Sequence, residues 1–306
     1  MALIDRSTEL DGSATDTLFP SENVGRFVAL RDAFQRLLRT RLAGFGLVVL
    51  GLLVLLAIFA SVLAPYDPQD QALESVLQAP SSVHLFGTDD LGRDILSRVI
   101  YGSRVSLEVG LISVSVALVG GCFIGLVAGY FGGLVDEALM RAMDALAAFP
   151  ALILALAITS ALGMGIGNAM IAIGIVYIPA FARLVRGQSL SVRERDFVTA
   201  ARSLGAGHFR IMFCHIWPNV TAPIIVQASL SVGFAIITEA ALSFLGVGVR
   251  PPTPSWGSML NEGYQYLETA PWMSVAPGAA IFITVLGLNL LGDGLRAMLD
   301  PRLSRR

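Results

Sequence analysis

The chain has 306 residues, of which 55% are apolar and 14% are charged, with a formal net charge of −2. Soluble globular proteins carry about a quarter charged residues, so this composition excludes an ordinary soluble domain and favours a polytopic membrane protein. All 21 cationic residues are arginine, and the missing lysine excludes a phosphate-binding P-loop and a Schiff-base site.

Long uncharged runs predict the membrane-spanning helices, because backbone groups inside lipid find no water and must bond within a helix. Single spans are predicted for four of these runs, namely 42–66, 109–135, 218–248 and 269–292. The run 145–182 would reach roughly 57 Å as one helix, against a hydrocarbon core of about 30 Å. We therefore expect two spans there, separated by the glycine-rich turn at 163–168.

Six spans place both termini on one side of the membrane, and arginine indicates which side. With the N-terminus inside, 17 of the 21 arginines are cytoplasmic, and Arg93, Arg98, Arg104 and Arg250 are outside. This bias follows the positive-inside rule. The expected segments are a cytoplasmic arm (1–41), the first transmembrane helix (42–66), an extracytoplasmic loop with a short helix (67–104), a five-helix core with a cytoplasmic loop at 187–219 (105–298), and a cytoplasmic tail (299–306).

The cytoplasmic loop at 187–219 contains a predicted amphipathic helix. Four apolar residues recur at i, i+3, i+4 and i+7 and fall on one face, namely Phe197, Ala200, Ala201 and Leu204. Gly205 is a suitable left-handed cap for this helix, and Pro218 is tolerated where the fifth span begins. On these residues alone, an ordinary helix lying on the membrane interface explains the loop equally well.

The loop also resembles a known motif. Thr199, Ala200 and Ala201, followed by Gly205 and then by His215-Ile216-Trp217-Pro218, resemble the EAA loop of permease subunits in binding-protein-dependent ABC importers. Thr199 stands where the family has glutamate, and Trp217 replaces a usual leucine. In that family the loop forms a coupling helix that sits in a groove of the ATPase subunit. The resemblance implies an ATPase-coupling role for Phe197, Thr199, Ala200, Ala201, Leu204, Gly205, His215, Ile216 and Pro218.

Three further motifs are similar to the peptide/nickel subfamily of these permeases, and to its second, C-type subunit. One precedes the second span and runs from Phe86-Gly87-Thr88-Asp89 to Tyr101-Gly102-Ser103-Arg104. The other two lie near the last outer loop, at 251–257 and 272–278. The resemblance extends over most of the chain from about residue 36.

This resemblance implies an all-α fold with six transmembrane helices, the MetI-like fold of type I importer permeases, in the bacterial inner membrane. It implies a non-catalytic subunit with no cofactor of its own, since ATP and Mg bind to partner subunits. The implied partners are a second homologous permease, two ATP-binding cassette ATPases, an extracytoplasmic substrate-binding protein and the lipid membrane, with no nucleic acid. Dipeptides or oligopeptides are the expected substrates, and nickel, glutathione or another small solute remain alternatives within the same class.

A self-sufficient secondary transporter is the alternative from a different class. Such proteins usually contain internal repeats and ionisable residues near the membrane midplane. In this sequence no internal repeat is visible, and the acids, including Glu239 near the far end of the fifth span, lie near the ends of spans. Intramembrane acids usually face a bundle interior or a water-filled path. Two interpretations of Glu239 therefore remain open, a role in the transport pathway or its gate and a structural polar contact between helices.

The remaining candidates have mainly structural interpretations. Thr88 is expected to cap a short outer helix whose first turn carries Asp89 and Asp90. Trp256 and Trp272 suit interfacial anchoring. The two cysteines and three histidines show no metal-ligand spacing, so no metal site is expected.

Overall fold

The computed structural model describes residues 41–299, and within this range it is built from helices without a β-strand. The predicted arm before residue 41 and the tail after residue 299 lie outside the described residues. The helices are α2 (Arg41–Ile58), α3 (Ala60–Leu63), α4 (Ile95–Phe131), α5 (Gly133–Ala147), α6 (Ala151–Leu162), α7 (Ile166–Arg193), α8 (Asp196–Ser203), α9 (His208–Arg210), α10 (Trp217–Phe244), α11 (Trp256–Tyr264) and α12 (Trp272–Leu299).

The predicted all-α polytopic class is confirmed. Four helices are long and apolar enough to cross a membrane, namely Ile95–Phe131, Ile166–Arg193, His208–Phe244 and Trp272–Met298. The pair α5 and α6 passes the same test together but is bent by 91°. The shorter apolar helix Leu42–Ile58 completes the set. In chain order, these elements correspond to the six predicted spans.

The second and third spans differ from the predicted boundaries. α4 begins at Ile95 rather than near 109, because the Asp94 carboxylate caps it by accepting a hydrogen bond from Ser97 N at 2.8 Å. α4 ends at Gly132, which adopts φ 67°. The charged stretch 136–144, which lies between the predicted second and third spans, belongs to α5, because its acids pair with a neighbouring helix. Arg186 Nη2 lies 2.6 Å from an Asp136 carboxylate oxygen, and Arg183 Nη2 lies 2.9 Å from Asp144.

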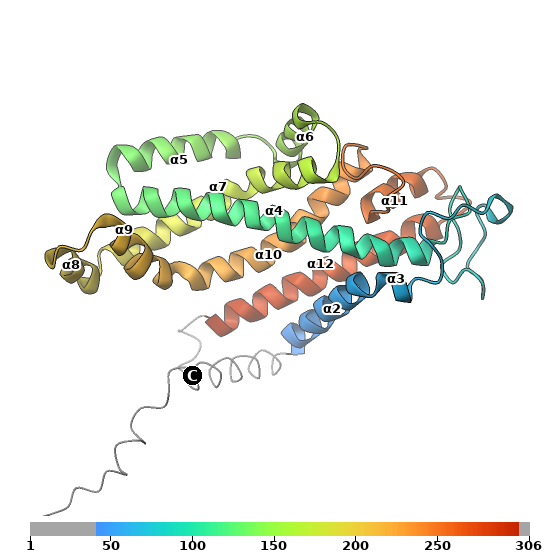
Figure 1. Cartoon of the computed structure of the whole chain (residues 1–306), viewed down its shortest axis with the longest axis horizontal. Helices are drawn as coiled ribbons and strands as arrows, with labels where there is room; N and C mark the ends of the chain where they lie inside the picture. The colour runs from blue at the N-terminus through green and yellow to red at the C-terminus, as the bar shows by residue number, and fades with distance from the viewer. Residues whose placement is uncertain (1–40, 300–306) are drawn as a thin grey trace, which may run out of the picture.

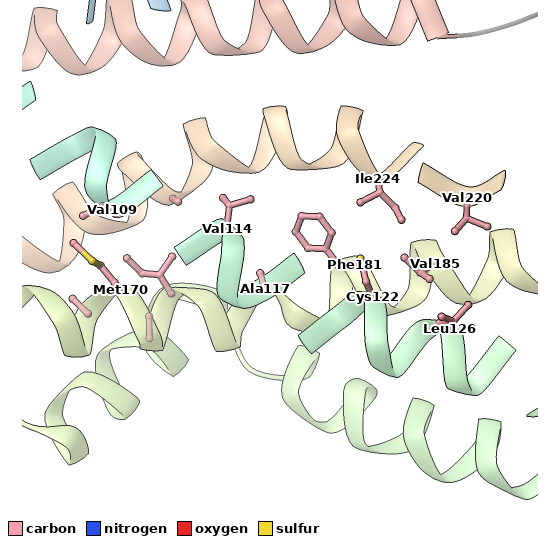
Figure 2. Close-up of a cluster of buried hydrophobic side chains, with 14 of the residues drawn as sticks. Val109, Val114, Ala117, Cys122, Leu126, Met170, Phe181, Val185, Val220 and Ile224 are labelled. Atoms are coloured by element: carbon pink, nitrogen blue, oxygen red, sulfur yellow. The ribbon is translucent and has the colours of Figure 1, made fainter. Parts of the chain in front are cut away.

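The core lies between α4, α7 and α10 (Figure 2), where Cys122 and Leu126 of α4 lie near Phe181 and Val185 of α7. Close approach of α4 and α7 requires the small residues of α4. A Cβ atom added to Gly125 would lie 2.4 Å from the Ala182 carbonyl oxygen. Gly121, Gly125 and Gly129 of α4 recur at four-residue spacing, and small residues at this spacing allow backbone contact between membrane helices.

The bundle has two distinct ends (Figure 1). α8 and α9 lie at one end, beyond the junction of α4 with α5. α11 and the segment that precedes α4 lie at the other. We call these the α8 end and the α11 end. α4 runs between them and reaches both.

Candidate functional site

α8 is a two-turn helix that projects from the α8 end (Figure 1). It ends at Gly205, which adopts φ 80°. Gly205 N donates to the Arg202 carbonyl and Ala206 N donates to the Ala201 carbonyl, both at 3.0 Å. These bonds satisfy carbonyls that a helix terminus leaves unpaired. The predicted left-handed cap at Gly205 is therefore confirmed.

The apolar face predicted for this helix points away from the bundle. Leu204 is 89% exposed and Phe197 is 40% exposed, while Thr199 and Ala200 are exposed and Ala201 is half-buried. Val198, by contrast, is completely buried. Contiguous exposed apolar side chains usually mark a surface that binds a partner or a membrane. We call Phe197, Ala200, Ala201 and Leu204 the α8 surface.

The second half of the predicted coupling set lies elsewhere. Ile216 is completely buried and packs in the same core as Val198, His215 is half-buried, and Pro218 is exposed at the start of α10. Ile216 thus supports α8 from beneath rather than joining its outer face. The sequence prediction missed Phe209 and Phe213, whose exposed rings stack with centroids 6.4 Å apart. Their spacing of four residues is the local signal that would have indicated them.

A π-helical turn, Ile211–Ile216, connects α9 to α10. Proline has no N–H, so Pro218 cannot donate to the carbonyl four residues before it. Instead, Trp217 N donates to Met212 O in the wider pattern, and Asn219 Nδ2 donates to His215 O at 2.7 Å. Single π-turns occur frequently at functional sites. The proline that was expected to open the fifth span therefore also shapes the loop before it.

Glu239 is 1% exposed near the end of α10. Ser243 Oγ donates to its carboxylate at 2.6 Å and accepts from Val249 N at 3.0 Å. These bonds join the last turns of α10 to the segment that follows. The position of Glu239 is therefore inside the protein, at the α11 end of its helix.

The α11 end contains a buried charge cluster. Asp89, Arg93 and Arg98 of this cluster lie in the predicted motif at 86–104, whereas the sequence did not indicate Glu262. Arg93 Nε lies 2.6 Å from an Asp89 carboxylate oxygen. Glu262 of α11 accepts from Arg98 Nη2 at 2.9 Å and from Arg93 Nη2 at 3.0 Å. Burial raises the pKa of the Glu262 carboxyl above its usual value, while the Arg98 and Arg93 guanidiniums oppose that rise. The carboxylates of this cluster converge on the two arginines.

Two expectations at this end are wrong. Thr88 does not cap a helix: its hydroxyl donates to Ser75 O and accepts from Gln78 N, which folds the loop back on itself. The cap is Asp94, described above. Trp256 is not an interfacial anchor, since it is 3% exposed and its Nε1 donates to Val99 O at 2.9 Å. Gly102 leaves room for this indole on α4, because a Cβ there would lie 2.7 Å from it.

Comparison with known proteins places this arrangement in context. A family model described as "Binding-protein-dependent transport system inner membrane component" matches residues 121–305. A second model, described as "N-terminal TM domain of oligopeptide transport permease C", matches residues 29–80. Together the two models cover both ends of the described structure.

Several curated proteins are similar over nearly the whole chain. The "Dipeptide transport system permease protein DppC" of Alkalihalophilus pseudofirmus is 47% identical over 89% of this chain and 90% of its own length. The "Di/tripeptide transport system permease protein DppC" of Pseudomonas aeruginosa is 46% identical over 90% and 92%. The "Glutathione transport system permease protein GsiD" of Pectobacterium atrosepticum is 46% identical over 89% and 91%.

Proposed function

Because the chain belongs to the family of inner-membrane components of binding-protein-dependent transport systems, we propose that it translocates dipeptides or oligopeptides as one permease subunit of an ABC importer. The single observation that carries the coupling part of this proposal is the α8 surface. Its apolar side chains are exposed at one end of the bundle, on a helix that is anchored from beneath by buried Val198.

The partners follow from the family and from the composition. A binding-protein-dependent system needs a substrate-binding protein and an ATPase. This chain has no lysine with which to form an ordinary ATP-binding P-loop, so the ATPase is supplied by other subunits. We propose two ATP-binding cassette subunits at the α8 end and a second, homologous permease beside this one. The chain itself then acts without a catalytic residue and without a cofactor of its own.

The proposed orientation places the α8 end in the cytoplasm and both termini on that side. The helices at or near this end, α7, α8 and α9, carry five arginines, namely Arg183, Arg186, Arg193, Arg202 and Arg210. Arginine-rich segments remain on the cytoplasmic side of bacterial inner membranes. The α11 end, where the segment before α4 carries Asp89, Asp90 and Asp94, would then face the substrate-binding protein.

The core packing indicates how an ATPase movement would reach the membrane. Val198, Ile211 and Ile216 belong to the same buried cluster as Val185 of α7 and Val220 of α10. A partner that displaces α8 would therefore carry the adjoining ends of α7 and α10 with it, because a close-packed core transmits displacement rather than absorbing it. Such rigid-body movement is one route to alternating access.

Uptake by the reconstituted transporter tests the proposal. The chain, a second permease, ATPase subunits and binding protein are placed in vesicles, and a labelled dipeptide is offered with and without ATP. We expect uptake that requires ATP and is lost when the ATPase lacks its phosphate-binding lysine. Uptake driven by an ion gradient in vesicles that hold this chain alone would contradict the proposal and support a secondary transporter.

Glutathione is the second candidate substrate, because a relative named for glutathione transport is nearly as similar as those named for peptides. Competition decides between them. Excess unlabelled dipeptide should abolish uptake of the labelled dipeptide, whereas excess glutathione or nickel should not. Stronger competition by glutathione would reassign the substrate within the same importer class.

A further inference from the structure

The loop between α7 and α10 makes a second connection to the bundle, through a helix to which it is not joined in sequence. Tyr130 lies in the last turn of α4, and its hydroxyl is 2.7 Å from Nδ1 of His208, the first residue of α9. The two rings also meet edge to face, with centroids 5.7 Å apart. The contact spans 78 residues of sequence.

Arg193 reinforces this contact from the end of α7. Its Nη1 donates to the carbonyl oxygens of Gly129 and Tyr130, each at 3.2 Å. These carbonyls belong to the last turn of α4, where no further helical N–H is available to bond them. A cation is also favourable at a helix C-terminus. The end of α4 is thus held by α7 and by α9 at the same place.

Tyr130 and His208 form a link between the core and the surface. Tyr130 is 6% exposed and packs in the cluster that contains Val198 and Ile216, whereas His208 is exposed. The Tyr130 hydroxyl can donate a hydrogen bond to Nδ1 of neutral His208, and protonated His208 can donate one from Nδ1 to the tyrosine oxygen. The hydrogen bond therefore survives a change in the charge of His208.

α4 is also fixed at its other end. There Arg98 pairs with Glu262, and Val99 O accepts from Trp256 Nε1, so two contacts join α4 to α11. The helix has 37 residues and reaches about 55 Å. α4 thus carries side-chain links both to the loop between α7 and α10, which we call the coupling loop, and to α11.

From these contacts we infer that Tyr130 and His208 are positioning residues that transmit movement of the coupling loop to α4, and through α4 to the α11 end. The inference rests on the proposed function. It adds a second route by which movement of the ATPase reaches the membrane, beside the chain connections of the loop to α7 and α10. Without the link, the loop would still dock and move, but α4 would follow it less closely.

The test is the number of substrate molecules transported per ATP hydrolysed in the reconstituted transporter. For Tyr130→Phe and for His208→Ala we expect this ratio to fall about fivefold, the population shift that follows from losing one hydrogen bond. Binding of the ATPase subunits and the thermal unfolding midpoint should stay close to wild type. His208→Asn, whose side chain places an acceptor near the position of Nδ1, should restore most of the ratio.

The double variant distinguishes a link from two separate effects. If the residues act through each other, Tyr130→Phe with His208→Ala should lower the ratio no further than either change alone. Tyr264→Phe, an exposed tyrosine at the α11 end, is the matched control and should leave the ratio unchanged. An unchanged ratio in both single variants, or additive losses in the double variant, would overturn the inference.

Failure of the proposed function would look different. A wild-type chain that does not bind an ATPase, or does not support ATP-driven uptake, would contradict the proposed function before any variant is compared. The link is judged only by differences among variants of a working transporter.

Discussion

The Arg98 guanidinium and the Glu262 carboxylate meet at 2.9 Å, although 164 residues separate them along the chain. Arg98 lies in the first turns of α4 and is 1% exposed, and Glu262 belongs to α11. Removing one partner of such a pair leaves a charge in a poorly solvated site, which is strongly destabilising. The pair therefore fixes α11, and the segment that contains it, against α4.

Glu262→Ala should destabilise the protein by about 2 kcal/mol, because it removes one of the two carboxylates that Arg98 and Arg93 share and leaves Asp89 as the other. This value lies below the range for a fully buried pair, since part of the Glu262 side chain reaches solvent. The midpoint of thermal unfolding in detergent measures it. Glu268→Ala, which changes an exposed glutamate just after α11, is the control. Equal midpoints for the two variants would refute the role given to Glu262.

Gly125→Ala should separate α4 from α7. The added methyl carbon would lie 2.4 Å from Ala182 O and 2.8 Å from the Val185 Cβ, so both helices must shift. Overpacking of this kind costs about 1–3 kcal/mol. Gly187→Ala is the matched control within α7, because nothing lies within 4 Å of its Cβ. That change should be neutral or stabilising, since alanine suits a helix interior better than glycine. Similar melting of both variants would contradict the packing argument.

Gly205→Val should strain the end of α8, because φ is 80° and only glycine adopts that region freely. No atom lies within 4 Å of the Cβ position, so the cost is that of the backbone alone, about 1 kcal/mol or slightly more. Gly205→Asn should cost less, since asparagine tolerates this conformation. Gly207→Val, at φ −69°, is the control. Hydrogen exchange of α8 amides reports the loosening, and equal exchange in the two valine variants would contradict it.

Leu204→Asp should remove ATPase binding without unfolding the permease. The side chain is 89% exposed, and substitutions at such positions usually change stability by less than about 0.5 kcal/mol. In a docked complex, however, the new carboxylate would be desolvated without a partner. Co-purification of ATPase subunits measures the effect. Leu73→Asp, at an exposed leucine of the segment that precedes α4, should leave co-purification intact. Retention of the ATPase by Leu204→Asp would count against docking at the α8 surface.

Much of this architecture follows from local patterns. Uncharged runs predicted the order of the crossings, because each helix must satisfy its backbone in lipid on its own. The period of Phe197, Ala200, Ala201 and Leu204 predicted α8, and Gly205 predicted its end. These features depend on neighbours in sequence, and the structure contains them.

The remaining features depend on distant partners, which leave little trace in one sequence. The charged stretch 136–144 interrupted the uncharged runs and was assigned to no span, but Arg183 and Arg186 of α7 pair with its acids and the segment is helical. Trp256 was predicted to lie at the membrane interface, but it is buried, because Gly102 of α4 leaves room for its indole ring. The partners of Glu262 and Tyr130 likewise became visible only when the helices were assembled.

Cysteine cross-linking tests the central claim, docking of an ATPase on the α8 surface, most directly. Cys122 is buried and Cys214 is exposed, so Leu204→Cys is introduced into a chain that carries Cys214→Ser, and a short bifunctional reagent is added to the assembled transporter. The account predicts an adduct with the mass of this chain plus one ATPase subunit, and none from Leu73→Cys in the same background. An adduct from Leu73→Cys, or the absence of one from Leu204→Cys in a transporter active in ATP-driven uptake, would contradict it.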